Sequence, residues 1–120
     1  MRQHLKIFKA LSDKNRLRIM KMLEVKAMCV CEITAVLNLA PSTVSKHLSI
    51  LDEAELIEDQ KEGKWVNYFL PKKVRTHEAT EMLKLLRHSL EDDPEVLADK
   101  EKTMGANRME LCGLSVKQSD

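Results

Sequence analysis

Aromatic residues, glycines and long apolar runs are all scarce in this chain, and each scarcity excludes a class of protein. Aromatic residues make up 3% of the 120 residues, so a core has to be built mainly from Leu, Ile, Val and the seven Met. The three glycines leave no Gly-rich loop that could hold a phosphate, and no Cys-His-acid constellation typical of a thiol enzyme is present. We therefore expect a protein that is not an enzyme.

No apolar run approaches the roughly 18 residues that a membrane span needs. The first ten residues, MRQHLKIFKA, also lack the apolar stretch of a secretion signal. We therefore expect a cytoplasmic protein with no membrane partner. Because cytoplasmic cysteines are usually kept reduced, the three cysteines are expected to be thiols rather than a disulfide framework.

Charge is unevenly distributed along the chain, although the net charge is only +1. Residues 1–73 hold 13 Lys and Arg against 9 Asp and Glu, whereas residues 74–120 hold 7 against 10. A basic excess confined to one part of a small protein is typical of a nucleic-acid-binding surface. The first 73 residues are therefore the expected DNA-binding part.

The apolar pattern at the start of the chain predicts two short helices. Leu5, Phe8 and Leu11 recur at helical spacing, which predicts a first helix. Ser12 precedes a second periodic segment over residues 13–23 and is expected to be its N-cap.

Two further helices are predicted with a short turn between them. The third is expected over residues 31–37, closed by Asn38 in a left-handed conformation, and Pro41 suits the first position of a fourth that ends near residue 54. The fourth helix turns apolar residues inward and leaves a row of short hydroxyls and one cation outward. The inward residues are Val44, Leu48 and Leu51, and the outward ones are Ser42, Thr43, Ser45, Lys46 and Ser49. This arrangement is typical of a helix-turn-helix.

A β-hairpin is predicted over residues 57–70, where apolar and polar residues alternate around a turn at Glu62-Gly63. Lys61 and Lys64 flank this turn and would extend toward a phosphate backbone. The fold class predicted for the chain is thus mainly α with a small β-hairpin, a winged helix-turn-helix over residues 1–73.

Residues 74–120 are predicted to add a dimerisation helix and a tail to the same structural domain. The helical pattern runs from Val74 to about Glu91, and Asp93-Pro94 either breaks it or starts another helix that ends before Gly105. A long apolar helix at the end of a small domain needs a partner, so we expect it to pack against its equivalent in a second protomer.

Three stretches of the sequence are similar to one protein family. They are FKALSDKNRLRIMKML (8–23), MCVCEI (28–33) and PSTVSKHLSILDEAELIEDQKEGKWVNYFL (41–70). The sequence resembles the ArsR/SmtB family of metalloregulatory repressors, and the arsenite-responsive members most. The resemblance implies a homodimer that occupies double-stranded operator DNA without a cofactor and dissociates when a metal or metalloid binds.

The resemblance implies a metal site at Cys29 and Cys31, whose thiolates would favour soft ions. Arsenite sensors commonly carry a third cysteine where this chain has Thr34, so Cys112 is the candidate third ligand. As(III) or Sb(III) is the expected inducer. Cadmium and zinc are less favoured, because no cysteine precedes Leu5, where cadmium sites of the family take further ligands.

The expected DNA contacts follow from the predicted helix-turn-helix and wing. They are Ser42, Thr43, Ser45 and Lys46 in the major groove, His47 either there or in packing, and Lys61 and Lys64 on the backbone.

Three alternatives stay open from the sequence. His77, His88 and Glu91 share a helical face if one helix covers them, which is similar to the zinc site of the family. A repressor of the same fold could respond to oxidation of its cysteines, although Cys-x-Cys is cramped for a disulfide. A thiol protein that buffers metal is the alternative from another class.

Overall fold

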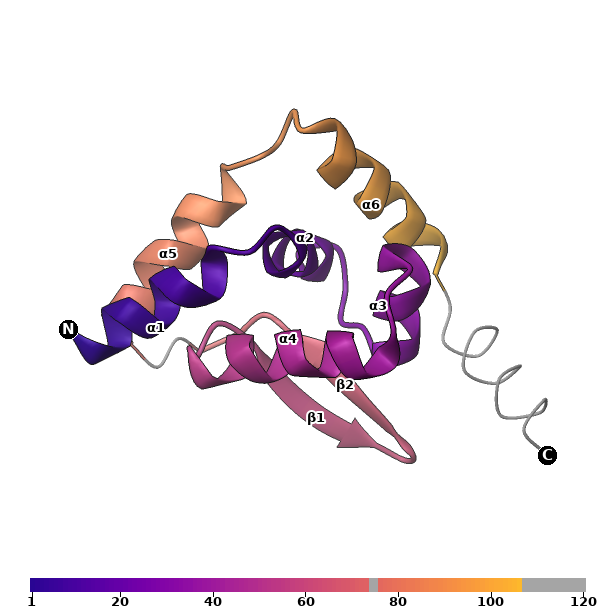
Figure 1. Cartoon of the computed structure of the whole chain (residues 1–120), viewed down its shortest axis with the longest axis horizontal. Coiled ribbons are helices and arrows are strands. Elements are labelled where there is room, and N and C mark those ends of the chain that lie inside the picture. The colour runs from indigo at the N-terminus through magenta and orange to yellow at the C-terminus, as the bar shows by residue number, and fades with distance from the viewer. Residues whose placement is uncertain (74–75, 107–120) are drawn as a thin grey trace.

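The computed structural model describes residues 1–73 and 76–106, which form six helices and one two-stranded sheet in those ranges (Figure 1). The elements in chain order are α1 (Arg2–Leu11), α2 (Lys14–Leu23), α3 (Val30–Leu37), α4 (Pro41–Glu53), β1 (Glu58–Glu62), β2 (Trp65–Phe69), α5 (His77–Arg87) and α6 (Pro94–Gly105). The predicted mainly helical fold with a hairpin is confirmed. The helix α2 lies at the centre, and the other helices surround it.

The corner between α1 and α2 depends on Asp13 rather than on Ser12. The Asp13 side chain accepts hydrogen bonds from the backbone N–H groups of Asn15 (2.8 Å) and Arg16 (3.0 Å), so Asp13 is the N-cap of α2. The Ser12 hydroxyl instead donates to the Lys9 carbonyl (2.8 Å) at the end of α1. The predicted N-cap was therefore wrong by one residue.

The core is aliphatic and rich in methionine, as the scarcity of aromatic residues predicted. The inward residues predicted for α4, Val44, Leu48 and Leu51, are buried, and Ile33, Val36 and Leu37 on α3 are buried as well. On α1, Ile7 and Ala10 are the buried residues, rather than the Leu5 and Phe8 whose spacing predicted the helix. Leu5 and Phe8 are 59% and 55% exposed, so α1 has an apolar face that the other described residues do not cover.

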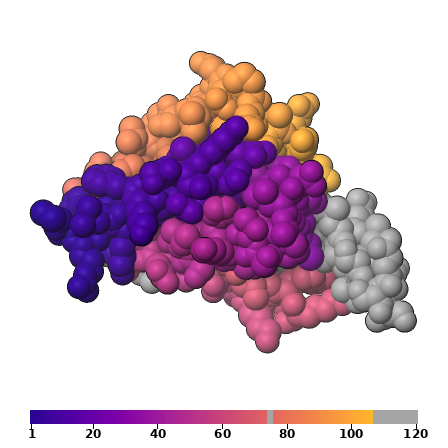
Figure 2. All heavy atoms as spheres, in the orientation of Figure 1, coloured from indigo at the N-terminus to yellow at the C-terminus, as the bar shows by residue number. Residues whose placement is uncertain are grey.

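The hairpin is a regular antiparallel pair in which Glu58 faces Phe69 and Glu62 faces Trp65. The turn between the strands is Gly63-Lys64, one residue later than predicted. Gly63 has φ +62°, a left-handed conformation that glycine adopts without steric cost. The hairpin projects beyond the helices at the lower edge of the molecule (Figure 2).

The C-terminal part forms two helices instead of one long one. The helix α5 ends at Arg87, and Leu90 takes a left-handed φ of +59° that a continuing helix would not allow. Asp93 then caps α6 by accepting from the Val96 N–H (3.0 Å). Asp93-Pro94 thus starts a second helix, which includes Gly105 rather than ending before it.

Buried charges hold α6 and the end of α5 against α2. The Arg18 guanidinium donates to both carboxylate oxygens of Asp99 at 2.7 and 2.9 Å. The Lys21 ammonium, with no exposed side-chain surface, donates to Glu24 (2.9 Å) and to the Leu86 carbonyl (2.7 Å). These contacts place two segments that are far apart in sequence side by side. In the described residues, no helix is long and apolar enough to cross a membrane.

Candidate metal and nucleic-acid sites

Cys29 is the N-cap of α3. Its backbone is extended, its side chain accepts from the backbone N–H of Glu32, and the Glu32 carboxylate accepts from the Cys29 N–H at 3.0 Å. This is a capping box with sulfur in the position that serine or threonine usually takes. The helix was predicted to begin at Cys31, so the capping role of Cys29 was not foreseen, although Glu32 three residues later is a signal for it.

The Cys29 thiol is almost completely buried, with 2% of the residue exposed. Burial raises the pKa of this thiol, and the nearby Glu32 carboxylate adds to the rise, whereas the backbone N–H groups of Glu32 and Cys31 oppose it. The N-terminal end of a helix favours a negative charge and therefore a thiolate. Burial outweighs that effect, so an ion that binds Cys29 has to displace a proton.

Cys31 lies in the first turn of α3, two residues beyond Cys29, and is half-buried. It is disulfide-bonded in the structure, whereas Cys29 carries a thiol, so the expectation that all three cysteines are thiols is wrong for Cys31, which binds an ion only after reduction. Thr34, which occupies the position of the missing third cysteine, donates its hydroxyl to the Cys31 carbonyl at 2.8 Å. The third candidate ligand, Cys112, lies outside the described residues. Cys29 and Cys31 are therefore the part of the predicted thiolate site that can be placed.

The predicted zinc alternative loses its geometric basis in the structure. Since α5 ends at Arg87, His88 is the C-cap and Glu91 lies beyond the helix, 3.7 Å from the Lys21 ammonium. His77, His88 and Glu91 therefore do not share one helical face. Residues 1–73 and 76–106 contain no group of three or more His, Cys, Asp or Glu side chains placed to hold a metal ion.

Two backbone hydrogen bonds join the cysteine segment to the hairpin. Met28, the residue before Cys29, donates its N–H to the Tyr68 carbonyl (2.9 Å) and accepts the Tyr68 N–H (2.8 Å). Met28 is thus paired beside β2 like a residue of a third strand. This connection was not predicted, because strand pairing between distant segments leaves no local sequence signal.

The outward face of α4 is as predicted. Ser42, Thr43, Ser45 and Lys46 are exposed near its N-terminal end, and Val44 and Leu48 fix the rotation of the helix by packing in the core. Lys61 on β1 and Lys64 in the turn are exposed as well, and the Lys64 ammonium lies 5.3 Å from the centre of the Trp65 ring. The helix α4 thus exposes hydroxyls and one ammonium group, and the hairpin exposes two ammonium groups. These are donor groups of the kinds that contact DNA in protein complexes.

His47 is half-buried and bonded to a residue that the sequence did not single out. Its Nδ1 lies 3.1 Å from Nη1 of Arg16 on α2. Arginine can only donate, so Nδ1 accepts and carries no proton in this arrangement. Arg16 also donates to the Ala10 carbonyl at 2.7 Å and to the Lys9 carbonyl at 3.3 Å. Arg16 therefore ties the end of α1 to α4.

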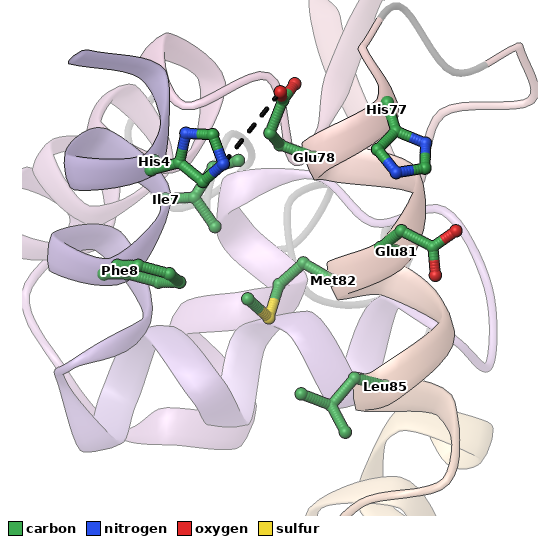
Figure 3. Close-up of a pocket in the computed structure, with 8 residues that line it drawn as sticks. All are labelled: His4, Ile7, Phe8, His77, Glu78, Glu81, Met82 and Leu85. Carbon is green, nitrogen blue, oxygen red and sulfur yellow. Dashed lines mark ion pairs between the residues drawn. The ribbon is translucent and has the colours of Figure 1, made fainter. Parts of the chain in front are cut away.

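A second surface, between α1 and α5, is hollow and largely apolar. A pocket of about 300 Å³ lies there, and Figure 3 shows the side chains that line it. Phe8 and Met82 face each other from the two helices, and His4 and Glu78 form a long ion pair of 4.0 Å at one end. Leu85 of α5, which also lines the pocket, is 61% exposed.

Comparison with known proteins identifies the family. Residues 13–59 match the sequence profile described as "Bacterial regulatory protein, arsR family". The structure matches HlyU from Vibrio cholerae with a TM-score of 0.62 and 31% identity, over 76% of this chain and 94% of that one. The chain belongs to the arsR family of bacterial regulatory proteins. The predicted resemblance and the winged helix-turn-helix fold are thereby confirmed.

Two further similar proteins have names that refer to different elements, arsenic in one and cadmium in the other. An arsenical resistance operon repressor of Escherichia coli is 40% identical over 67 residues, which are 55% of this chain and 57% of that protein. The cadmium sensor CMTR of Mycobacterium tuberculosis has a TM-score of 0.52 and 30% identity, over 78% of this chain and 84% of that one. This arsR-family chain spans little more than half of the E. coli relative.

Proposed function

We propose that this arsR-family protein is a transcriptional repressor that binds operator DNA as a homodimer and releases it when arsenite or antimonite binds cysteine thiolates. The observation that carries the proposal is the position of Cys29 and Cys31. Both lie at the start of α3, the first helix of the DNA-reading unit, beside the residue that is paired to β2. A ligand held there acts on the helix-turn-helix and on the wing together.

DNA would be bound by α4 and the hairpin. Ser42, Thr43, Ser45 and Lys46 would lie in the major groove, and Lys61 on β1 and Lys64 in the hairpin turn would contact the backbone. The geometric support is that all six side chains are exposed, on two elements whose relative position the core fixes.

The inducer site would consist of Cys29 and Cys31, completed by Cys112 from the same or the partner chain. Trivalent arsenic bonded to sulfur takes three thiolates, and Thr34 has no sulfur to offer. The naming of an arsenical resistance repressor among the relatives supports arsenite. The cadmium sensor among the structural matches makes Cd²⁺ the ion to compare with it.

The homodimer would form through the apolar face of α1 and α5. Leu5, Phe8 and Leu85 are all more than half exposed, and Phe8 and Leu85 line the hollow between these helices. A second copy related by a two-fold axis would cover this face with the same residues of its own. Such a dimer presents two copies of α4, which suits a palindromic operator.

Metal and DNA binding are coupled in this scheme by α3 and the Met28–Tyr68 pairing. If binding of an ion reorients the start of α3, both α4, which packs against it, and β2 change position. By linkage, metal weakens DNA affinity by the same factor by which DNA weakens metal affinity.

The test is a titration of the reduced protein bound to a fluorescent duplex that has been selected from a random-sequence pool. Arsenite should release the duplex from the wild type, and it should fail to release it from Cys29→Ser and Cys31→Ser, which should still bind DNA. Parallel titrations with Cd²⁺ and Zn²⁺ identify the ion. A complex that none of these ions dissociates would refute the proposal, as would equal release from the serine variants.

A further inference from the structure

We propose that Arg16 is a DNA-contacting residue that binds a backbone phosphate beside the recognition helix α4, and that His47 positions it. This inference rests on the proposed DNA-binding function and adds to it a contact from α2, outside the helix-turn-helix. The contact belongs to the sequence-independent part of binding, because a phosphate is present at every step of a duplex.

The place for the phosphate is a hollow of about 500 Å³ beside α4, lined by Arg16, Ser42, Thr43, Lys46, His47 and Ile50. Two permanent cations, Arg16 and Lys46, and two hydroxyls therefore border one opening. Three of these six residues, Ser42, Thr43 and Lys46, are exposed. Cations with hydroxyl donors around a hollow match the chemistry of a phosphodiester oxygen.

The guanidinium of Arg16 has donors to spare for this role. A guanidinium has five N–H groups. One each from Nε, Nη1 and Nη2 is used by the Ala10 carbonyl, His47 and the Lys9 carbonyl. One N–H on each terminal nitrogen therefore remains. Nη1 also lies 4.0 Å from an oxygen of Asp13, which balances the charge of Arg16 without a hydrogen bond.

The hydrogen bonds of Arg16 also fix the orientation of its guanidinium. With 12% of its side chain exposed, Arg16 is held from α1 by two carbonyls and from α4 by the His47 ring. A side chain held in this way loses little conformational freedom when it binds a phosphate. Without the acceptor on His47, the end of the guanidinium would be free to turn from α4.

Arg16 also lines a neighbouring hollow with Lys6 and Lys9 of α1, and Glu53 of α4 lines the same hollow. The positive surface thus continues from α4 across Arg16 to α1. If α4 lies in the major groove, the DNA backbone that borders the groove and runs from α4 toward α1 would meet cations on three helices. This continuity favours a nucleic acid over a small anion as the occupant.

The experiment measures the salt dependence of binding to the selected duplex and to a random duplex. Arg16→Gln should weaken binding to both roughly ten-fold and should reduce the slope of log K against log salt concentration by about 0.9, the value for one phosphate contact. Arg18→Gln is the matched control. Arg18 is on the same helix, but its guanidinium faces Asp99 on α6, so this variant should leave the slope unchanged even if it is less stable.

The positioning role of His47 has its own readout. His47→Leu, which removes the acceptor, should weaken binding to both duplexes. His47→Gln, whose amide oxygen can accept from Arg16, should restore it. In the Arg16→Gln background, His47→Leu should have no further effect, because the residue through which it acts is gone.

A measurement on the wild type does not depend on the folding of any variant. The side-chain Nε–H resonance of Arg16 should shift when the random duplex is added, and that of Arg18 should stay in place. If the wild type binds no duplex, the proposed function fails and this inference fails with it. If the wild type binds DNA, but the Arg16 resonance stays in place like that of Arg18 and Arg16→Gln leaves the salt slope unchanged like Arg18→Gln, this inference alone is refuted.

Discussion

Cys29 combines two properties that a pair of substitutions can separate. Its sulfur caps α3 and is also a proposed ligand. Serine keeps a capping acceptor and removes the sulfur, whereas alanine removes both. We expect Cys29→Ser to retain the wild-type free energy of unfolding and Cys29→Ala to lose about 0.5–2 kcal/mol, the usual cost of a lost N-cap. Urea denaturation of the three reduced, metal-free proteins measures both differences.

Arsenite binding by Cys29→Ser and Cys29→Ala should not depend on their difference in stability. Both variants lack the sulfur, so both should lose the thiolate-to-arsenic absorption that arsenite produces in the wild type. If Cys29→Ser were as unstable as Cys29→Ala, the capping role would be wrong. If either variant kept the full absorption, the ligand role would be wrong.

Asp13 gives the α1–α2 corner a pH dependence of known sign. Burial acts to raise the pKa of Asp13, but hydrogen bonds from the Arg16 and Asn15 N–H groups and the charge of Arg16 outweigh it and hold the pKa below the ordinary value of an aspartate. A lowered pKa stabilises the fold above the unfolded value, and this contribution disappears as pH falls through the folded value. Asp13→Asn keeps the cap and lacks the charge. Its deficit in unfolding free energy should be below about 1 kcal/mol at pH 7, since 35% of the side chain is exposed and solvent screens it.

The measurement is urea denaturation of the wild type and Asp13→Asn from pH 7 to pH 3. The difference between the two proteins should stay constant down to about pH 4 and shrink below it. Asp13→Ala is the control for the cap itself and should be about 1 kcal/mol less stable than Asp13→Asn throughout this pH range. A difference that grows toward low pH would contradict the assigned direction of the pKa shift.

At the scale of elements, the sequence predicted what depends on local pattern. Asn38 was expected to close α3, and it adopts φ +57°, a conformation that asparagine tolerates. Pro41 was expected at the first position of α4 and lies there. The outward hydroxyls of α4 followed from the spacing of its apolar residues, so most of the surface proposed to face DNA was predictable.

The parts that were missed depend on contacts between distant segments. The exposure of Phe8 was not predicted, because apolar spacing indicates a helix and does not say which of its faces other segments cover. The predicted helix through Glu91 ended early because Lys21 binds the Leu86 carbonyl, which a sequence pattern does not show. The Arg16–His47 and Met28–Tyr68 contacts link residues that are far apart in sequence. Cys112, outside the described residues, stays a prediction.

The hairpin should report on metal binding, because β2 is paired to the residue before Cys29. The chain has one tryptophan, Trp65, and it begins β2 three residues before Tyr68. We expect arsenite to change the emission of Trp65 in the metal-free, DNA-free protein and to have no effect in Cys29→Ser. Fluorescence titration measures this directly.

Lys64→Gln is the control for the ammonium that lies over the Trp65 ring. It should alter the starting emission and leave the arsenite response in place. If arsenite released DNA while the emission of Trp65 stayed constant, coupling through the hairpin would be wrong, and α3 alone would transmit the signal.

On the scale of the whole molecule, the proposed sites lie on different helices. The cysteines and the DNA-reading residues belong to α3, α4 and the hairpin, whereas the uncovered apolar face belongs to α1 and α5 (Figure 1). Arg16 connects the two groups, since it binds carbonyls of α1 and the His47 ring of α4. A change in the angle between protomers would therefore reach α4 through this residue.

The exposed face of α1 and α5 should determine the oligomeric state. Phe8→Glu places a charge where a second copy would bury an aromatic ring, so we expect it to convert a dimer into a monomer in sedimentation velocity, with helical content unchanged. The monomer should lose most of its affinity for a palindromic duplex, because only one α4 can bind at a time. Leu97→Glu is the matched control: Leu97 is apolar and 51% exposed, like Phe8, but lies on α6. A Phe8→Glu protein that remains dimeric, or a Leu97→Glu protein that dissociates, would place the dimer interface elsewhere.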